Sequence, residues 1–157
     1  MKEIRELLSR DLSERIEEVI KVDQRDEATV HNEITEYVFT DRIEEQYLEL
    51  FDAISEGPGN PSEDVGVWVS GFFGSGKSSF AKNLGYVLEN QDILSESASK
   101  LFIKQLEEQD GTDPKVKKIR DLIEYIDTRL DTNVIMFDVQ VDRAVRRHCP
   151  ITWNGKL

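Results

Sequence analysis

Apolar residues recur at helical spacing in the first third of the chain. They share one face of the stretch Asp26 to Val38, which predicts a helix there. Thr40 is the expected N-cap of a second helix, with Asp41 and Glu44 in the first turn, where the helix dipole favours acids. The apolar stripe of this second helix consists of Ile43, Tyr47, Leu50, Phe51 and Ile54. We expect this stripe to pack against the rest of the chain, because burying each large apolar side chain gains roughly 1.5–3 kcal/mol.

Three more helices are predicted after residue 77. The first has an apolar stripe made of Phe80, Leu84, Val87 and Leu88. Ser95 is the expected cap of the second, which the Asp-Gly-Thr sequence at 110–112 ends. Asp113 followed by Pro114 predicts the start of the third, since proline suits the first helical position.

Two short apolar runs, residues 65–69 and 134–141, indicate buried strands because they are rich in β-branched side chains. Residues 57–64 contain prolines and glycines in a polar run and are interpreted as a linker. The predicted organisation is a helical element over residues 1–56, the linker, and a truncated core over residues 65–157. The predicted fold class is α/β, a partial P-loop NTPase with a parallel sheet and flanking helices, preceded by the small helical element.

The strongest motif lies between the first predicted strand and the following helix. Residues 71–78 read GFFGSGKS and fit G-x-x-x-x-G-K-[ST], the phosphate-binding P-loop. Gly71, Gly74 and Gly76 allow backbone conformations closed to other residues, so that amide groups can point at an anion. Phe72 and Phe73 complete the loop, which we expect to bind ATP at the helix N-terminus.

Side chains after the glycines supply the charge chemistry of the motif. Lys77 is the expected catalytic residue, because its ammonium can neutralise the β- and γ-phosphates. The Ser78 hydroxyl is the expected Mg²⁺ ligand. Ser75 and Ser79 are expected to support the loop beside the cofactor. The implied cofactors are ATP and Mg²⁺.

Asp138 is a second candidate for the metal. Four apolar residues precede it, as in the Walker B pattern, whose carboxylate orders Mg²⁺. However, Val139 follows where hydrolysing ATPases usually carry another acid. A polar role at the edge of the sheet is the alternative, and both interpretations remain open.

Composition excludes several classes of function. The 157 residues carry 32 acidic and 20 basic side chains, and the resulting charge of −12 argues against direct nucleic-acid binding. No apolar run reaches the roughly 18 residues of a membrane span, and no signal-peptide pattern begins the chain, which predicts a cytoplasmic protein. Cys149 is the sole cysteine, so no disulfide can form within the chain. The acidic surface also suits a high-salt cytoplasm, a hypothesis that loss of stability in dilute buffer would support.

Residues 16–90 resemble the N-terminus of the BrxC family, the large P-loop proteins of the BREX bacteriophage-exclusion systems, which are related to PglY. The resemblance is carried by residues 19–24, by residues 36–38 with Thr40, and above all by residues 66–78. A loop that contains a Phe-Phe pair and is preceded by Trp-Val-Ser is a more specific pattern than the P-loop motif alone. Ser79 is a departure, because the family often has histidine there.

The resemblance implies the ATP-binding part of an antiviral defence ATPase, with other BREX-type defence proteins as partners and a possible homo-oligomer. Family members are much longer, and the resemblance fades after about residue 90, so we expect this chain to be an N-terminal fragment. An alternative is a truncated or degenerate assembly module that binds nucleotide weakly without hydrolysing it. A small-molecule P-loop kinase is a further alternative, although no lid or substrate-binding set is evident.

Overall fold

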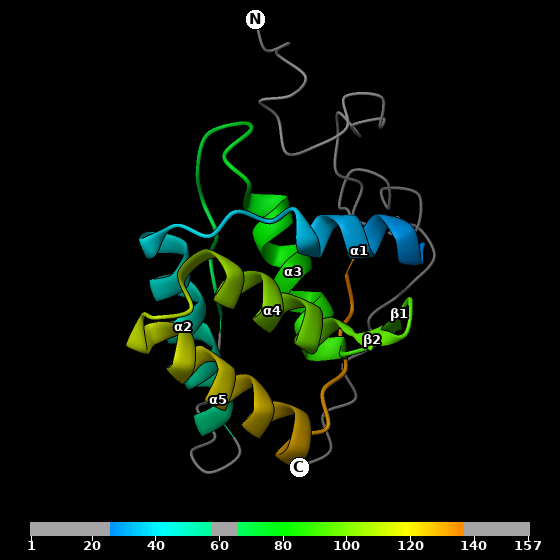
Figure 1. The fold of residues 1–157 in the computed structure, drawn as a ribbon. Coiled ribbons are helices and arrows are strands. Elements are labelled where there is room, and N and C mark those ends of the chain that lie inside the picture. The colour runs from blue at the N-terminus through cyan, green and yellow to red at the C-terminus, as the bar shows by residue number, and fades with distance from the viewer. Residues whose placement is uncertain (1–25, 58–65, 137–157) are drawn as a thin grey trace, which may run out of the picture.

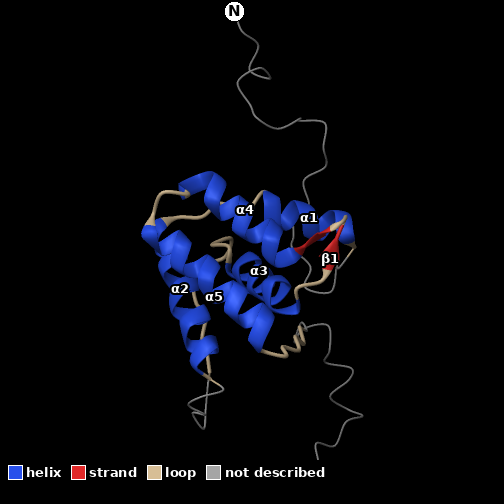
Figure 2. Cartoon of the chain, turned by 60° about the horizontal axis from the view of Figure 1, so that its bottom comes forward, coloured by secondary structure: helices blue, strands red, loops and turns tan. Residues whose placement is uncertain are grey.

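A computed structural model of the chain describes residues 26–57 and 66–136. Five helices and one pair of short strands make up the regular structure of these residues (Figures 1 and 2). The elements are α1 (Glu27–Thr35), α2 (Asp41–Glu56), α3 (Lys77–Glu89), β1 (Asp92–Ile93), β2 (Glu96–Ser97), α4 (Ala98–Asp110) and α5 (Pro114–Arg129). None of these helices combines the length and the apolar character needed to cross a membrane.

Two predicted helix caps are confirmed. The Thr40 hydroxyl accepts a hydrogen bond from the Ile43 amide at 3.4 Å, and α2 begins directly after it. The Asp113 carboxylate accepts from the Lys115 amide at 2.7 Å and starts α5, with Pro114 in its first turn. These caps satisfy amides that have no partner inside the helix, which is why the helices begin where they do.

The sequence predicts Ser95 as a helix cap, and this prediction is wrong. Ser95 does not cap a helix, because the chain forms a hairpin at this point. Strand β1 pairs with β2 in antiparallel register, with Asp92 opposite Ser97. Leu94 and Ser95 form the turn with φ values of 48° and 89°. Two residues at positive φ match the twist of an antiparallel pair, so the hairpin closes tightly. Helix α4 therefore starts two residues later, after Ser97.

The predicted parallel sheet is wrong, and the structure is mainly helical rather than α/β. Residues 66–70 are assigned to no strand, and Val67 and Trp68 are 58% and 89% exposed. Residues 134–136, the described part of the second predicted strand, also pair with nothing, and Met136 instead packs against Gly85 of α3. A strand is stable only when a neighbour bonds its amides and carbonyls, and neither run has such a neighbour within the described residues.

An aromatic cluster joins the helices into one core. The Tyr47 ring of α2 stacks on Phe80 of α3 with ring centres 4.4 Å apart, and it meets Phe102 of α4 edge-on at 5.1 Å. Phe51 also stacks with Tyr47, with ring centres 5.9 Å apart. The Tyr47 hydroxyl donates to the Phe80 carbonyl at 3.0 Å, so this buried polar group is satisfied. The expected packing of the α2 stripe against the later helices is confirmed.

Replacement of Phe51 by alanine tests the importance of this packing. Phe51 is fully buried, so Phe51→Ala should lower the free energy of unfolding by about 3–5 kcal/mol through lost burial and a cavity. Val38→Ala is the control, because Val38 is 67% exposed and should change stability by less than about 0.5 kcal/mol. Urea denaturation followed by circular dichroism measures both variants, and equal midpoints would contradict the proposed role of Phe51.

The stability of the fold should also fall at alkaline pH. Burial, together with the neighbouring Tyr37, raises the pKa of the Tyr47 hydroxyl far above its usual value. An unfolded tyrosine ionises near pH 10. Since the folded-state pKa is the higher one, the contribution of Tyr47 is complete below pH 10 and is lost as the pH rises above it. Tyr47→Phe should cost about 1 kcal/mol at pH 7 but flatten this alkaline decline.

The control for this pH dependence is Tyr125→Phe. Tyr125 is 45% exposed on α5 and should leave the slope of stability against pH unchanged. Thermal melts between pH 8 and pH 11 compare the two variants with the parent. An alkaline slope that Tyr125→Phe reduces as much as Tyr47→Phe would contradict the assignment to Tyr47.

Candidate functional site

The predicted phosphate loop lies at the edge of the helical body, where the chain arches before it enters α3 (Figure 1). Gly74 and Gly76 have φ values of 76° and 80°, in the left-handed region that glycine adopts without strain. A Cβ added to Gly71 would lie 2.6 Å from the Ser75 hydroxyl oxygen. A side chain would therefore be strained at Gly74 and Gly76, and at Gly71 it would force the Ser75 hydroxyl to move.

Helix α3 begins directly after the loop, as the motif predicts. Its N-cap is Gly76, which makes no side-chain cap hydrogen bond to the amides of the first turn. The helix itself is established at once, since the Phe80 amide donates to the Gly76 carbonyl at 2.9 Å. A helix N-terminus without a side-chain cap, together with the positive end of the helix dipole, favours an anion.

The side chain of Lys77 folds back over the loop. Its Nζ donates to the Phe72 carbonyl at 2.6 Å and to the Ser75 hydroxyl at 3.4 Å. The Ser75 amide donates to the same Phe72 carbonyl at 3.2 Å and closes the turn. The ammonium is therefore held beside the loop backbone.

The other predicted site residues fall into three groups. Ser78 is exposed in the first turn of α3, and Ser79 is half-buried beside it. Phe72 and Phe73 point into solvent, with exposed fractions of 91% and 104%. Asp138 lies outside the described residues. Within the described ranges, His, Cys, Asp and Glu side chains gather nowhere in a group of three that could hold a metal.

A buried polar network anchors α3, and sequence reasoning missed it. The Glu33 carboxylate of α1 accepts one hydrogen bond from Lys82 Nζ and one from the Tyr86 hydroxyl, both at 2.7 Å. Lys82 is only 1% exposed, so its charge is neutralised inside the protein. The side-chain amide of Asn83 donates to the backbone carbonyl of Ser79 at 2.9 Å and to that of Glu33 at 3.5 Å. The network ties the helix that follows the loop to α1.

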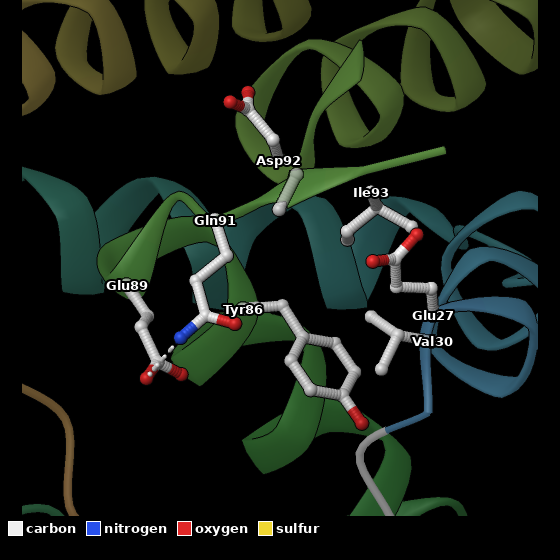
Figure 3. A pocket seen from close by; sticks show the side chains of 8 residues that line it. Glu27, Val30, Tyr86, Glu89, Gln91, Asp92 and Ile93 are labelled. Atoms are coloured by element: carbon white, nitrogen blue, oxygen red, sulfur yellow. Dashed lines mark hydrogen bonds between the residues drawn. The ribbon is translucent and has the colours of Figure 1, made fainter. Parts of the chain in front are cut away.

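A cavity of about 190 Å³ lies apart from the loop, between α1, the end of α3 and β1 (Figure 3). Its lining consists of Glu27, Val30, Tyr86, Glu89, Gln91, Asp92, Ile93 and Ala98. Glu89 accepts a hydrogen bond from Gln91 at 2.8 Å, and Glu27 accepts one from the Leu94 amide at 3.3 Å. Sites for ligands of nucleotide size usually measure about 300–1,000 Å³. The small volume and the carboxylates make this cavity unsuitable for a nucleotide.

Comparison with known proteins identifies no relative at the level of families or folds. No protein family model matches the chain, and no solved structure matches it.

The anchoring network can be tested through Glu33. Glu33→Ala leaves the buried Lys82 ammonium without this carboxylate and should destabilise the protein by about 3–5 kcal/mol. The double variant Glu33→Ala with Lys82→Met should recover a large part of that loss. Glu107→Ala is the control, since the Arg120–Glu107 pair is similarly short at 2.9 Å but exposed, and should cost less than about 1 kcal/mol. Equal effects in urea denaturation would contradict a special role for the buried pair.

Proposed function

We propose that this chain binds the phosphate groups of ATP with residues 71–76 and the N-terminus of α3. One observation carries the proposal. A glycine loop with positive φ at Gly74 and Gly76 leads into a helix N-terminus without a side-chain cap, and the Lys77 ammonium lies over that loop. Backbone donors and one mobile cation together form the arrangement that anions prefer.

The residues of the loop have distinct roles in this proposal. The amides at the start of α3 donate to the phosphates. Lys77 leaves the neutral Phe72 carbonyl and binds the β- and γ-phosphates. The contact between the ammonium and a charged phosphate is stronger than its hydrogen bond to the neutral carbonyl. The exposed Ser78 hydroxyl is available to coordinate the Mg²⁺ that accompanies ATP.

The proposed biological role is that of the ATP-binding part of a BREX-type antiviral defence ATPase. It is supported by the resemblance to the BrxC family over residues 66–78, with the two phenylalanines inside the loop. The proposed partners are other proteins of such a defence complex. Hydrolysis needs a positioned water and an orienting acid in addition to phosphate binding. Asp138 is the candidate for the orienting acid. We propose that this chain alone hydrolyses little ATP.

A second candidate function is an assembly module that binds nucleotide without hydrolysing it. The observation in its favour is the exposure of large apolar side chains next to the loop, since Trp68, Phe72 and Phe73 are each about nine-tenths exposed or more. Apolar groups gathered on a surface are typical of sites that contact other macromolecules.

Nucleotide binding can be measured by isothermal titration calorimetry with Mg-ATP. The parent chain should bind weakly, and Lys77→Ala should abolish the heat signal because it removes the cation of the loop. Lys117→Ala is the matched control, an exposed lysine on α5 that is outside the loop, and it should bind like the parent. Undiminished binding by Lys77→Ala, or an equal loss in Lys117→Ala, would refute the proposed site.

Turnover is tested separately by phosphate release from Mg-ATP. We expect residues 1–157 to release little or no phosphate above the rate of Lys77→Ala. A robust rate that both Lys77→Ala and Asp138→Asn remove would assign hydrolysis to this chain and make Asp138 the Mg²⁺-ordering acid. The assembly-module alternative would then be wrong.

A further inference from the structure

Residues 66–70, here called the uncharged strip, are unusual for this protein. Val67, Trp68 and Val69 are 58%, 89% and 43% exposed. Charged residues make up 33% of the chain, yet none occurs from residue 65 through residue 76. An exposed apolar segment that is also free of charge indicates a surface for another macromolecule.

The backbone of the uncharged strip restricts what can cover it. The chain runs from residue 66 to residue 72 without a bend or a turn. Among the residues that the structure describes, none makes a backbone hydrogen bond with residues 66–70. Covering only the side chains would bury unpaired amides and carbonyls, which is costly. A second β-strand satisfies the backbone and covers the side chains at once, so the occupant is a strand.

The sequence of the uncharged strip favours a second copy of the same chain as that strand. It reads Gly-Val-Trp-Val-Ser and is nearly symmetric about Trp68. Antiparallel pairing about a twofold axis at Trp68 places Val67 opposite Val69 of the second copy, and the two Trp68 residues opposite each other. Such self-complementarity is what a twofold interface requires. The absence of charge also lets two chains of charge −12 approach at this place.

We propose that two copies of this chain associate through antiparallel pairing of residues 66–70. The pair is short, and two-stranded ribbons are marginal in water, so the association is weak and depends on concentration. Salt strengthens it, because salt screens the repulsion between the two acidic chains. The loops at residues 71–76 follow the strands at opposite ends of the pair. Each loop therefore stays open, and the pairing does not depend on phosphate binding.

Cysteine cross-linking tests the register in a Cys149→Ser background. Antiparallel pairing places directly opposite residues about 4.5–5.5 Å apart, within reach of a disulfide, whereas diagonal residues are about 7–8 Å apart. Trp68→Cys should cross-link with itself under mild oxidation. Val67→Cys should not cross-link with itself, but it should do so when mixed with Val69→Cys. Self-cross-linking of Val67→Cys instead would show parallel pairing and overturn the proposal.

Sedimentation equilibrium tests the association itself. The dimer fraction of the parent should rise with protein and NaCl concentration, whereas Trp68→Lys should stay monomeric. Helical circular dichroism should be the same in both, since Trp68 is exposed and its backbone bonds no described residue. Ile135→Lys is the matched control, because Ile135 is 81% exposed elsewhere and should retain the dimer.

Lys77→Ala separates this proposal from phosphate binding, since this variant should no longer bind ATP but should still form the dimer. A parent chain that remains monomeric at high protein and salt concentration overturns the pairing, whatever the outcome of the ATP titration. Equal dissociation of Ile135→Lys would likewise overturn it, because the effect would then follow from added charge at any exposed site.

Discussion

Burial of the Tyr47 side chain is the interaction on which the other contacts depend. The ring is fully buried and contacts aromatic rings from α2, α3, α4 and the segment between α1 and α2. An unpaired hydroxyl in that setting would cost roughly 1–3 kcal/mol. The Tyr47 hydroxyl avoids this cost because it donates a hydrogen bond to the Phe80 carbonyl. Phe80 follows Lys77 by three residues on the same helix. The core that stabilises the protein therefore also fixes the orientation of the helix that ends the loop.

Helices were predictable from the sequence to the extent that local chemistry decides them. Thr40 and Asp113 cap helices with their own side chains, and the break at residues 110–112 needs no distant partner. A strand is different, because its stability depends on a neighbour that the local sequence does not specify. The run at 66–69 has the composition of a buried strand, but the apolar faces of the helices pack with one another instead. The hairpin was missed because Leu94 and Ser95 adopt positive φ without being glycine or asparagine.

The same distinction separates the two parts of the candidate site. The loop was predicted because three glycines and a lysine at fixed spacing determine its geometry within eight residues. The Glu33 network was not, since Glu33 and Lys82 are 49 positions apart in the sequence. Lysine is usually exposed, and only tertiary packing reveals that Lys82 is buried and needs a carboxylate. A lysine and a tyrosine four residues apart share a helix face, but that spacing alone does not identify Glu33 as their common partner.

An acidic chain and an anion site are compatible because electrostatic interactions in salt solution are short-ranged. At physiological ionic strength the field of an exposed charge decays over about 8 Å, so distant carboxylates of this −12 chain act weakly on a ligand at the loop. Lys77 is the one charged side chain between residues 65 and 81. Lys82, the next cation along α3, is already neutralised by Glu33. Within the loop and the first turn of α3, the positive charge therefore comes from the Lys77 ammonium and from the helix N-terminus, and both favour an anion.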